Sequence, residues 1–248
     1  MIIAIVTPKG GEGKTTSALL LTMIESETKK VLGIDFDPQN SFTYSLGLDY
    51  GNDNVKVNNI ATFMHTEKID PIKINENLDF IPSSFKLSSM RTMPQNELKK
   101  ALVKTGFDKK YDRIIIDTSP AYDNFFLTVG YAADVVIYPI RLRSVFSQKC
   151  LFETIEMLDA ECPSVLHKMT ILPTFFENTK DEQNIIDYIQ SQIGDGGQDC
   201  FFETRIPETK KALRITADIE SYDDKIAERL TEPYRHLARE IGEKYGNC

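Results

Sequence analysis

The sequence has no apolar run of the roughly 18 residues that a membrane-spanning helix requires. Because its first apolar run begins at Ile2, we expect no signal peptide, transit peptide or N-terminal DNA-binding module. Linkers rich in proline, glycine and serine are absent from the sequence, as are internal repeats and low-complexity segments. We therefore expect one cytoplasmic domain over residues 1–248 with a single well-buried core and no integral membrane segment.

Cysteines and basic residues are also few. The four cysteines, Cys150, Cys162, Cys200 and Cys248, form no C-x-x-C pair, so the sequence suggests neither a zinc site nor a disulfide framework. Lys and Arg total 29 against 37 Asp and Glu, which gives a formal net charge of −8 at pH 7. Affinity for phosphate backbones comes mainly from clustered Lys and Arg. This balance disfavours a dedicated nucleic-acid binder, but it does not exclude a local basic patch.

The sequence does contain a glycine-rich segment, TPKGGEGKTT, at residues 7–16. Apolar runs on both sides of it predict a buried strand, a tight turn and a helix, in that order. Gly10, Gly11 and Gly13 lack side chains where the backbone must curl around a phosphate chain, so successive N–H groups can face anionic oxygens. The helix that begins at about Lys14 adds the positive end of its dipole. This pattern predicts a nucleotide-binding site.

The segment departs from the general P-loop pattern G-x-x-x-x-G-K-[ST] at its start, where the sequence has Lys9 and two glycines. At the end of the pattern, Lys14 is placed to reach the β- and γ-phosphates, and the hydroxyl of Thr15 is placed to ligate Mg²⁺, with Thr16 following. An ordinary strand-to-helix turn is the alternative for any glycine-rich segment. Because every position of the deviant pattern K-G-G-x-G-K-[ST] is filled, the nucleotide site is favoured.

With its second lysine, the chain resembles the ParA/MinD superfamily of ATPases, whose deviant Walker A motif has this form. The resemblance implies that ATP is the nucleotide and Mg²⁺ its cofactor. It also implies an ATP-dependent homodimer in which Lys9 reaches across the interface to the partner's nucleotide. Lys9 is therefore expected to act in catalysis as well as in nucleotide binding.

Two further segments place carboxylates at the edge of the predicted sheet where the P-loop lies. Residues 30–35 predict a strand that leads to Asp35 and Asp37, and residues 111–119 predict a strand that ends near Asp117. The string IDFDPQNS resembles the Walker A′ motif, which implies that Asp37 orients or activates the attacking water and that Asp35 helps to hold the Mg²⁺ shell. Asp117 resembles the Walker B aspartate, which holds Mg²⁺ through a water. For Asp37, an aspartate that begins an ordinary turn is the alternative.

The rest of the chain alternates apolar strands with helical stretches, as expected for right-handed βαβ crossovers. We expect further strands over residues 78–82, 134–140, 169–176 and 201–207, and helices over residues 14–27, 60–65, 97–105, 144–158, 183–192 and 222–245. This order predicts an α/β fold, a three-layer sandwich with a mostly parallel P-loop NTPase-type sheet. Pro233 is expected in the first turn of a new helix. Mixed charges in the terminal segment favour a helix packed on the domain over a basic membrane anchor.

The resemblance has less specific support near the end of the chain. Pro207 matches the family position at which a proline packs near the adenine, with Thr174 as a second candidate. Residues 118–121 occupy the place of a switch segment that senses the γ-phosphate. Basic residues that often bind DNA in this family are absent here, and Lys210, Lys211 and Arg214 are the candidates for a substitute patch.

Glu12 fills a position of the loop where the family usually has a small or apolar residue. A carboxylate close to a triphosphate costs electrostatic free energy unless it points outward or pairs with a cation. We also consider that it faces a partner subunit.

The resemblance implies a ParA-type ATPase in plasmid or chromosome partition, with nonspecific DNA binding and slow hydrolysis that a ParB-like centromere-binding protein stimulates. Such a protein would be associated with the nucleoid. A MinD-like switch that positions cargo on a membrane or protein assembly is one alternative. A metabolic P-loop enzyme such as an amidoligase is another, although the DPQ string and the lack of a glutaminase-like region disfavour it.

Overall fold

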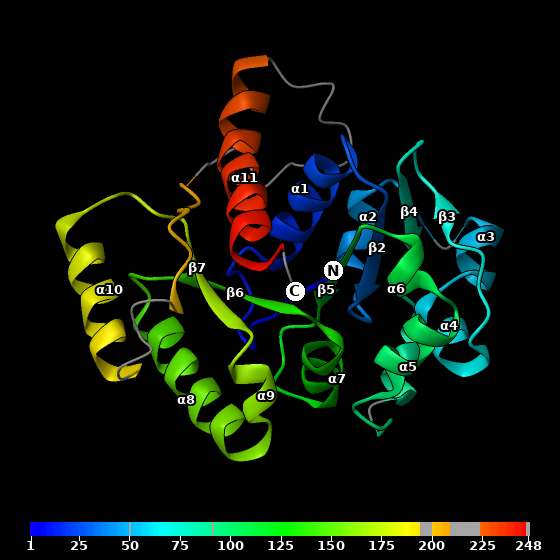
Figure 1. The fold of residues 1–248 in the computed structure, drawn as a ribbon, viewed down its shortest axis with the longest axis horizontal. Coiled ribbons are helices and arrows are strands. Elements are labelled where there is room, and N and C mark those ends of the chain that lie inside the picture. The colour runs from blue at the N-terminus through cyan, green and yellow to red at the C-terminus, as the bar shows by residue number, and fades with distance from the viewer. Residues whose placement is uncertain (50, 91, 194–199, 209–223, 247–248) are drawn as a thin grey trace.

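A computed structural model of the chain describes residues 1–49, 51–90, 92–193, 200–208 and 224–246. Its centre is a seven-stranded sheet in the order β3-β4-β2-β5-β1-β6-β7 (Figure 1). The strands are β1 (Ile2–Ile5), β2 (Val31–Phe36), β3 (Ile72–Lys73), β4 (Leu78–Ile81), β5 (Arg113–Thr118), β6 (Val135–Arg141) and β7 (Met169–Thr174). Neighbouring strands are parallel except β3, which is antiparallel to β4. The predicted mostly parallel sheet is confirmed.

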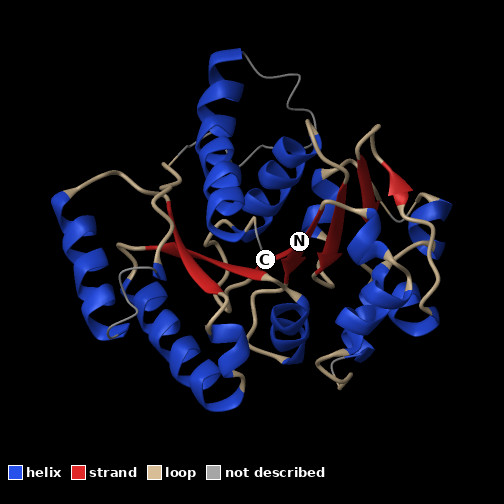
Figure 2. Cartoon of the chain, viewed as in Figure 1, coloured by secondary structure: helices blue, strands red, loops and turns tan. Residues whose placement is uncertain are grey.

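Helices cover both faces of this sheet (Figure 2). One face carries α1 (Lys14–Ser26), α2 (Ser41–Ser45) and α11 (Asp224–Tyr245). The opposite face carries α4 (Ile60–Thr66), α5 (Glu97–Lys104), α6 (Phe107–Lys110), α7 (Asn124–Ala132), α8 (Val145–Glu161) and α9 (Pro163–Leu166). The short helix α3 (Asp53–Val57), a 3₁₀ turn over Phe85–Met90 and α10 (Lys180–Ile193) complete the described elements. The predicted three-layer sandwich is confirmed.

The alternation of side chains along β1 explains why both faces are apolar. Ile3 and Ile5 pack into the core beneath α1, whereas Ile2 and Ala4 pack into the core on the opposite face. All four side chains are almost completely buried. A strand that is buried on both faces reads as a continuous apolar run, which is what residues 2–6 show.

The expectation of a strand over residues 201–207 is wrong. This segment forms only isolated bridges, Ile171 to Phe201 and Phe176 to Pro207. Pro173 of β7 has no N–H with which to continue the ladder. The side chain of Arg205 instead donates to the carbonyl of Phe202. The carboxylate of Glu240 on α11 accepts from the backbone N–H groups of residues 203 and 204, at 2.6 and 2.9 Å.

The terminal helix packs on the domain as predicted, but Pro233 does not begin a new helix. It lies inside the continuous helix α11. Tyr234, Leu237 and Ile241 are buried in the core that contains α1. This packing offsets the hydrogen bond that proline removes. Among the helices that the structure describes, none combines the length and the hydropathy needed to cross a bilayer.

Candidate nucleotide-binding site

The carboxyl ends of β1, β2 and β5 lie side by side and carry the polar residues that the sequence singles out. Parallel pairing places Asp117 of β5 opposite Ile5 of β1 on one side and opposite Asp35 of β2 on the other. The glycine-rich loop leaves β1 at this edge and ends where α1 begins at Lys14. The P-loop and both acidic segments therefore meet at one edge of the sheet, as predicted.

The backbone of the loop requires glycine at two positions. Gly11 and Gly13 have φ angles of 82° and 89°, in the left-handed region that side chains disfavour. Gly13 is also the N-cap of α1. Space is not the reason for this glycine, because a Cβ atom there would lie 3.7 Å from Thr174 and Phe175, at ordinary contact distance. The left-handed turn sets the direction in which the backbone enters α1.

Lys14 lies beneath the loop, with its side chain almost entirely buried. Its Nζ donates to the carbonyl oxygen of Lys9 at 3.2 Å, so the lysine spans the loop from within. Burial lowers the pKa of Lys14, and the nearby carboxylates of Asp117 and Asp37 oppose that shift. A buried ammonium that is close to glycine N–H groups is suited to bind an anionic phosphate chain.

Thr15 and Asp117 form the pair that fits a divalent cation. Thr15 Oγ1 donates to Asp117 Oδ2 at 2.7 Å. The other oxygen, Oδ1, is buried and receives no hydrogen bond from any residue that the structure describes. Burial, followed by the negative charge of Asp35, raises the pKa of Asp117 to about 8. A hydroxyl beside a carboxylate with one oxygen that receives no hydrogen bond from the described residues is a donor set that Mg²⁺ accepts together with phosphate oxygens and waters.

Asp35 and Asp37 have different surroundings. Asp35 Oδ2 accepts from the backbone N–H of Thr43 at 2.8 Å and from its hydroxyl at 2.7 Å, and Oδ1 accepts from the N–H of Asp37 at 3.0 Å. Burial raises the pKa of Asp35 to about 7. The hydrogen bonds of Asp35 to Thr43 and Asp37 therefore hold the loop after β2 in place. Asp37 Oδ1 accepts from the N–H of Gln39 at 2.9 Å, which holds the carboxylate in a tight turn at the edge of the site.

Lys9 and Glu12 form an ion pair within the chain, with 2.5 Å between Lys9 Nζ and Glu12 Oε1. The structure confirms that Glu12 pairs with a cation. It contradicts the suggestion that Glu12 faces a partner subunit, because this residue is only 1% exposed. Its second oxygen accepts from the backbone N–H of Arg141 at 2.6 Å, and Ser147 Oγ donates to the first at 2.9 Å.

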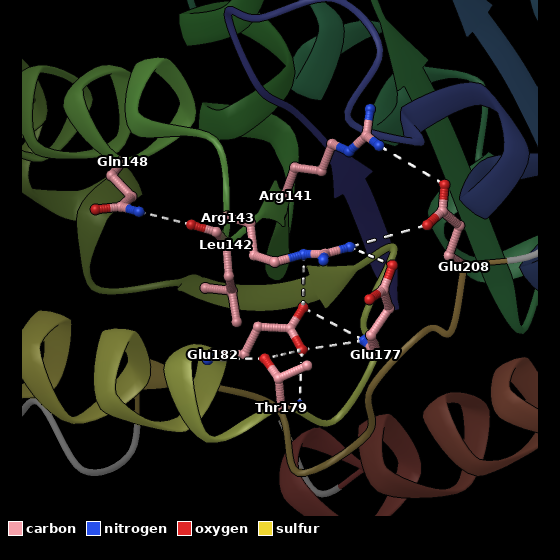
Figure 3. Close-up of polar contacts among 8 residues, drawn as sticks. All are labelled: Arg141, Leu142, Arg143, Gln148, Glu177, Thr179, Glu182 and Glu208. Carbon is pink, nitrogen blue, oxygen red and sulfur yellow. Dashed lines mark hydrogen bonds and ion pairs between the residues drawn. The ribbon is translucent and has the colours of Figure 1, made fainter.

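The loop between β6 and α8 contributes to the site, although the sequence reasoning missed it. Figure 3 shows Arg141, at the end of β6, and Arg143, in this loop, directed toward acidic side chains that follow β7. Arg143 pairs with Glu177 and lies 3.7 Å from the buried carboxylate of Glu182, while Arg141 lies 3.8 Å from Glu208. The string RLRS directly after an apolar strand was the available signal, since it places two cations at the same sheet edge.

The candidates for adenine contact lie beside the P-loop. Thr174 Oγ1 donates to the carbonyl of Glu12 at 3.0 Å. Phe175 follows with φ at 52°, a strained conformation for an aromatic residue, and the guanidinium of Arg141 stacks on its ring at 4.5 Å. Pro207 is bridged to the next residue, Phe176. Ser119, in the expected switch segment, is buried with no partner for Oγ among the described residues.

The candidate DNA patch, Lys210, Lys211 and Arg214, lies outside the described residues. Cys248 does so as well. The other cysteines, Cys150, Cys162 and Cys200, form no disulfide within the described part of the chain.

Comparison with known proteins agrees with this geometry. A family model described as AAA domain (AAA_31) matches residues 1–168. The chromosome-partitioning ATPase Soj of Treponema pallidum is 29% identical to the chain, over 96% of each protein. MJECL24, an uncharacterised protein of Methanocaldococcus jannaschii, is 33% identical over 63% of the chain, which spans 65% of that protein. In a crystal structure of BB_S35 from Borrelia burgdorferi bound to AMPPNP, 98% of each chain aligns, with a TM-score of 0.78 and 25% identity.

The family model thus matches more than half of the chain. This match agrees with the deviant P-loop, with the carboxylates at the ends of β2 and β5 and with the order of the strands in the sheet. The chain belongs to the AAA_31 family of AAA domains and is a P-loop ATPase of the ParA/MinD superfamily.

Proposed function

We propose that this ATPase acts in plasmid or chromosome partition. ATP and Mg²⁺ drive a sandwich homodimer, the dimer binds DNA without sequence preference, and a ParB-like protein stimulates slow hydrolysis. The observation that carries the proposal is a P-loop with two lysines, Lys9 and Lys14, at the sheet edge that also holds Asp37 and Asp117. The Treponema relative, which is a chromosome-partitioning ATPase by name, supports the choice of process.

In this proposal the loop surrounds the phosphates through the backbone of Gly10, Gly11, Gly13 and Thr16. Lys14 neutralises the β- and γ-phosphates from beneath. Thr15 and Asp117 hold Mg²⁺, and the unpartnered oxygen of Asp117 supplies the negative charge for it.

Asp37 then acts on the attacking water, and Asp35 supports it. Phosphoryl transfer needs little covalent chemistry from the protein, so an oriented water in line with the γ-phosphate is the main requirement. The backbone N–H of Asp37 donates to Asp35 Oδ1, and this hydrogen bond fixes the position of the Asp37 backbone. We also assign Asp35 to the outer Mg²⁺ shell, and Pro207 to the adenine. Lys9 serves the nucleotide of the partner subunit.

The test is binding of the purified protein to nonspecific duplex DNA with ATP, with ADP and without nucleotide, across a salt series. We expect binding with ATP only, with a steep loss of affinity as salt rises, because each neutralised phosphate releases counterions. Replacing Lys210, Lys211 and Arg214 with alanine should reduce both the affinity and the salt slope. Lys56→Ala, an exposed lysine on α3, is the matched control and should change neither. Lys14→Ala should remove the ATP dependence.

The absence of DNA binding, or of dimerisation, would distinguish the alternatives. If ATP drives dimerisation but no nucleotide state binds DNA, the matrix is a membrane or a protein assembly, as in the MinD-like alternative. Cosedimentation with anionic liposomes in the presence of ATP would then distinguish these two surfaces. Hydrolysis by a protein that stays monomeric with ATP would contradict the partition proposal itself.

A further inference from the structure

We propose that Glu12 is a positioning residue that holds Lys9 inside its own subunit until ATP-dependent dimerisation draws Lys9 across the interface. This inference rests on the proposed function, in which Lys9 serves the partner's nucleotide. We call Lys9, Glu12, Ser144 and Ser147 the Lys9 latch. The latch sets the protein concentration at which active dimers form.

The ammonium of Lys9 is fully engaged in the latch. Besides Glu12 Oε1 at 2.5 Å, it donates to Ser147 Oγ at 2.9 Å and to Ser144 Oγ at 3.3 Å. Only 30% of the Lys9 side chain is exposed. Three acceptors satisfy the three N–H donors of the ammonium. Lys9 therefore has no donor left for the nucleotide of the partner subunit while the latch is closed.

The carboxylate of Glu12 cannot follow Lys9 outward, because other contacts fix it. Its Oε2 accepts from Arg141 N, and its main-chain carbonyl accepts from Thr174 Oγ1. The loop between Arg141 of β6 and Ser147 of α8 is itself anchored, because Arg143 pairs with Glu177 and Gln148 Nε2 donates to Leu142 O at 2.6 Å (Figure 3). Opening the latch therefore moves the lysine and leaves the carboxylate in place.

This arrangement makes opening costly. Lys9 is the one cation within salt-bridge distance of Glu12 in the part of the chain that the structure describes. When Lys9 leaves, the carboxylate stays buried without an ion-pair partner, within the loop that is proposed to bind a triphosphate. Dimer formation must supply this free energy, so the latch disfavours dimers at low protein concentration.

The first experiment measures the latch directly in the nucleotide-free protein. Reductive methylation followed by mass spectrometry gives the reaction rate of each lysine. Glu12→Gln keeps the size of the side chain but removes the ion pair, and we expect Lys9 to react about fivefold faster, as for loss of an ion pair worth about 1 kcal/mol. Lys29, whose 2.5 Å ion pair with buried Glu25 resembles the latch, is the internal control and should react at its wild-type rate. In Glu25→Gln we expect Lys29 to react faster than in the wild type and Lys9 to react at its wild-type rate. Equal Lys9 rates in the wild type and in Glu12→Gln would overturn the proposal.

The second experiment measures ATP hydrolysis per molecule against protein concentration. Because two latches open in each homodimer, Glu12→Gln should lower the concentration for half-maximal activity by about 25-fold, which is the fivefold effect of one latch squared. Ser147→Ala, which removes a hydroxyl shared by Lys9 and Glu12, should lower it less, and this milder variant keeps the test open if Glu12→Gln does not fold. A concentration-dependent wild type with both variants unshifted would overturn the latch alone. A wild type with flat activity per molecule would overturn the proposed function instead.

Discussion

The hydroxyl of Thr15 donates a 2.7 Å hydrogen bond to Oδ2 of Asp117, and so joins the first turn of α1 to the end of β5. This bond leaves Oδ1 of Asp117 buried without a described partner, next to the buried carboxylate of Asp35. Two adjacent buried carboxylates are unfavourable when both are charged. In the nucleotide-free protein, electrostatic repulsion between these carboxylates is therefore unfavourable at the place where Mg²⁺ is proposed to bind.

Stability should show this cost through its dependence on pH. Burial raises the pKa of Asp117 from 3.8 to about 8, so the folded state binds a proton that the unfolded state releases. The contribution of Asp117 to the free energy of unfolding is therefore greatest below the unfolded value and falls as pH rises toward 8. Asp117→Asn removes the charge. We expect the free energy of unfolding of the variant to exceed that of the wild type by about 2 kcal/mol at pH 8.5 and by little at pH 4.

Urea unfolding at the two pH values measures this difference. The same variant should lose Mg²⁺-dependent hydrolysis, since the carboxylate that balances the ion is gone. A stability difference that stays constant between pH 4 and pH 8.5 would show that the charge of Asp117 is not its cause.

Asp37 should be needed for hydrolysis but not for binding. We expect Asp37→Ala to bind ATP as the wild type does, to accumulate as an ATP dimer, and to hydrolyse ATP at least about 100-fold more slowly, the usual size of a lost general-base contribution. Asp49→Ala is the matched control, because Asp49 is exposed and accepts from a backbone N–H two residues on, as Asp37 does. Single-turnover hydrolysis and size-exclusion chromatography with ATP provide the readouts. Normal hydrolysis by Asp37→Ala would refute the assignment.

The packing of α11 on α1 leads to a stability prediction away from the chemistry. Tyr234 Oη and Ser17 Oγ form a buried 3.1 Å hydrogen bond, and Leu237 is completely buried in the same core. Tyr234→Phe should cost about 1 kcal/mol of unfolding free energy, because the Ser17 hydroxyl loses its partner. Leu237→Ala should cost about 3 kcal/mol through lost burial and a cavity. Urea unfolding checks both values, and two variants as stable as the wild type would contradict the packing described here.

Much of the fold could be predicted from sequence because its signals are local. The continuous apolar runs over residues 2–6 and 114–116 indicate strands buried on both faces, and the observed β1 and β5 agree. The P-loop also follows from local residue types, since Gly11 and Gly13 have the positive φ angles that only glycine adopts readily.

The errors arose where distant residues decide the structure. Whether residues 201–207 form a strand depends on Pro173, which lacks the N–H, and on Glu240, which binds the backbone from α11. Pro233 stays inside a helix because of burial against α1. Besides Lys9, the partners of Glu12 are Arg141 of β6 and Ser147 of α8, about 130 residues away, so no local pattern could have identified these two.

The central claim, that Lys9 acts on the partner's nucleotide, is tested most directly by mixing two inactive variants. Lys9→Ala keeps its own Asp37, and Asp37→Ala keeps its own Lys9, so a mixed dimer contains one complete site. With equal amounts, half of the dimers are mixed and one of their two sites is active, and we predict about a quarter of wild-type hydrolysis. A mixture no more active than its separate components would contradict the claim and confine Lys9 to its own subunit.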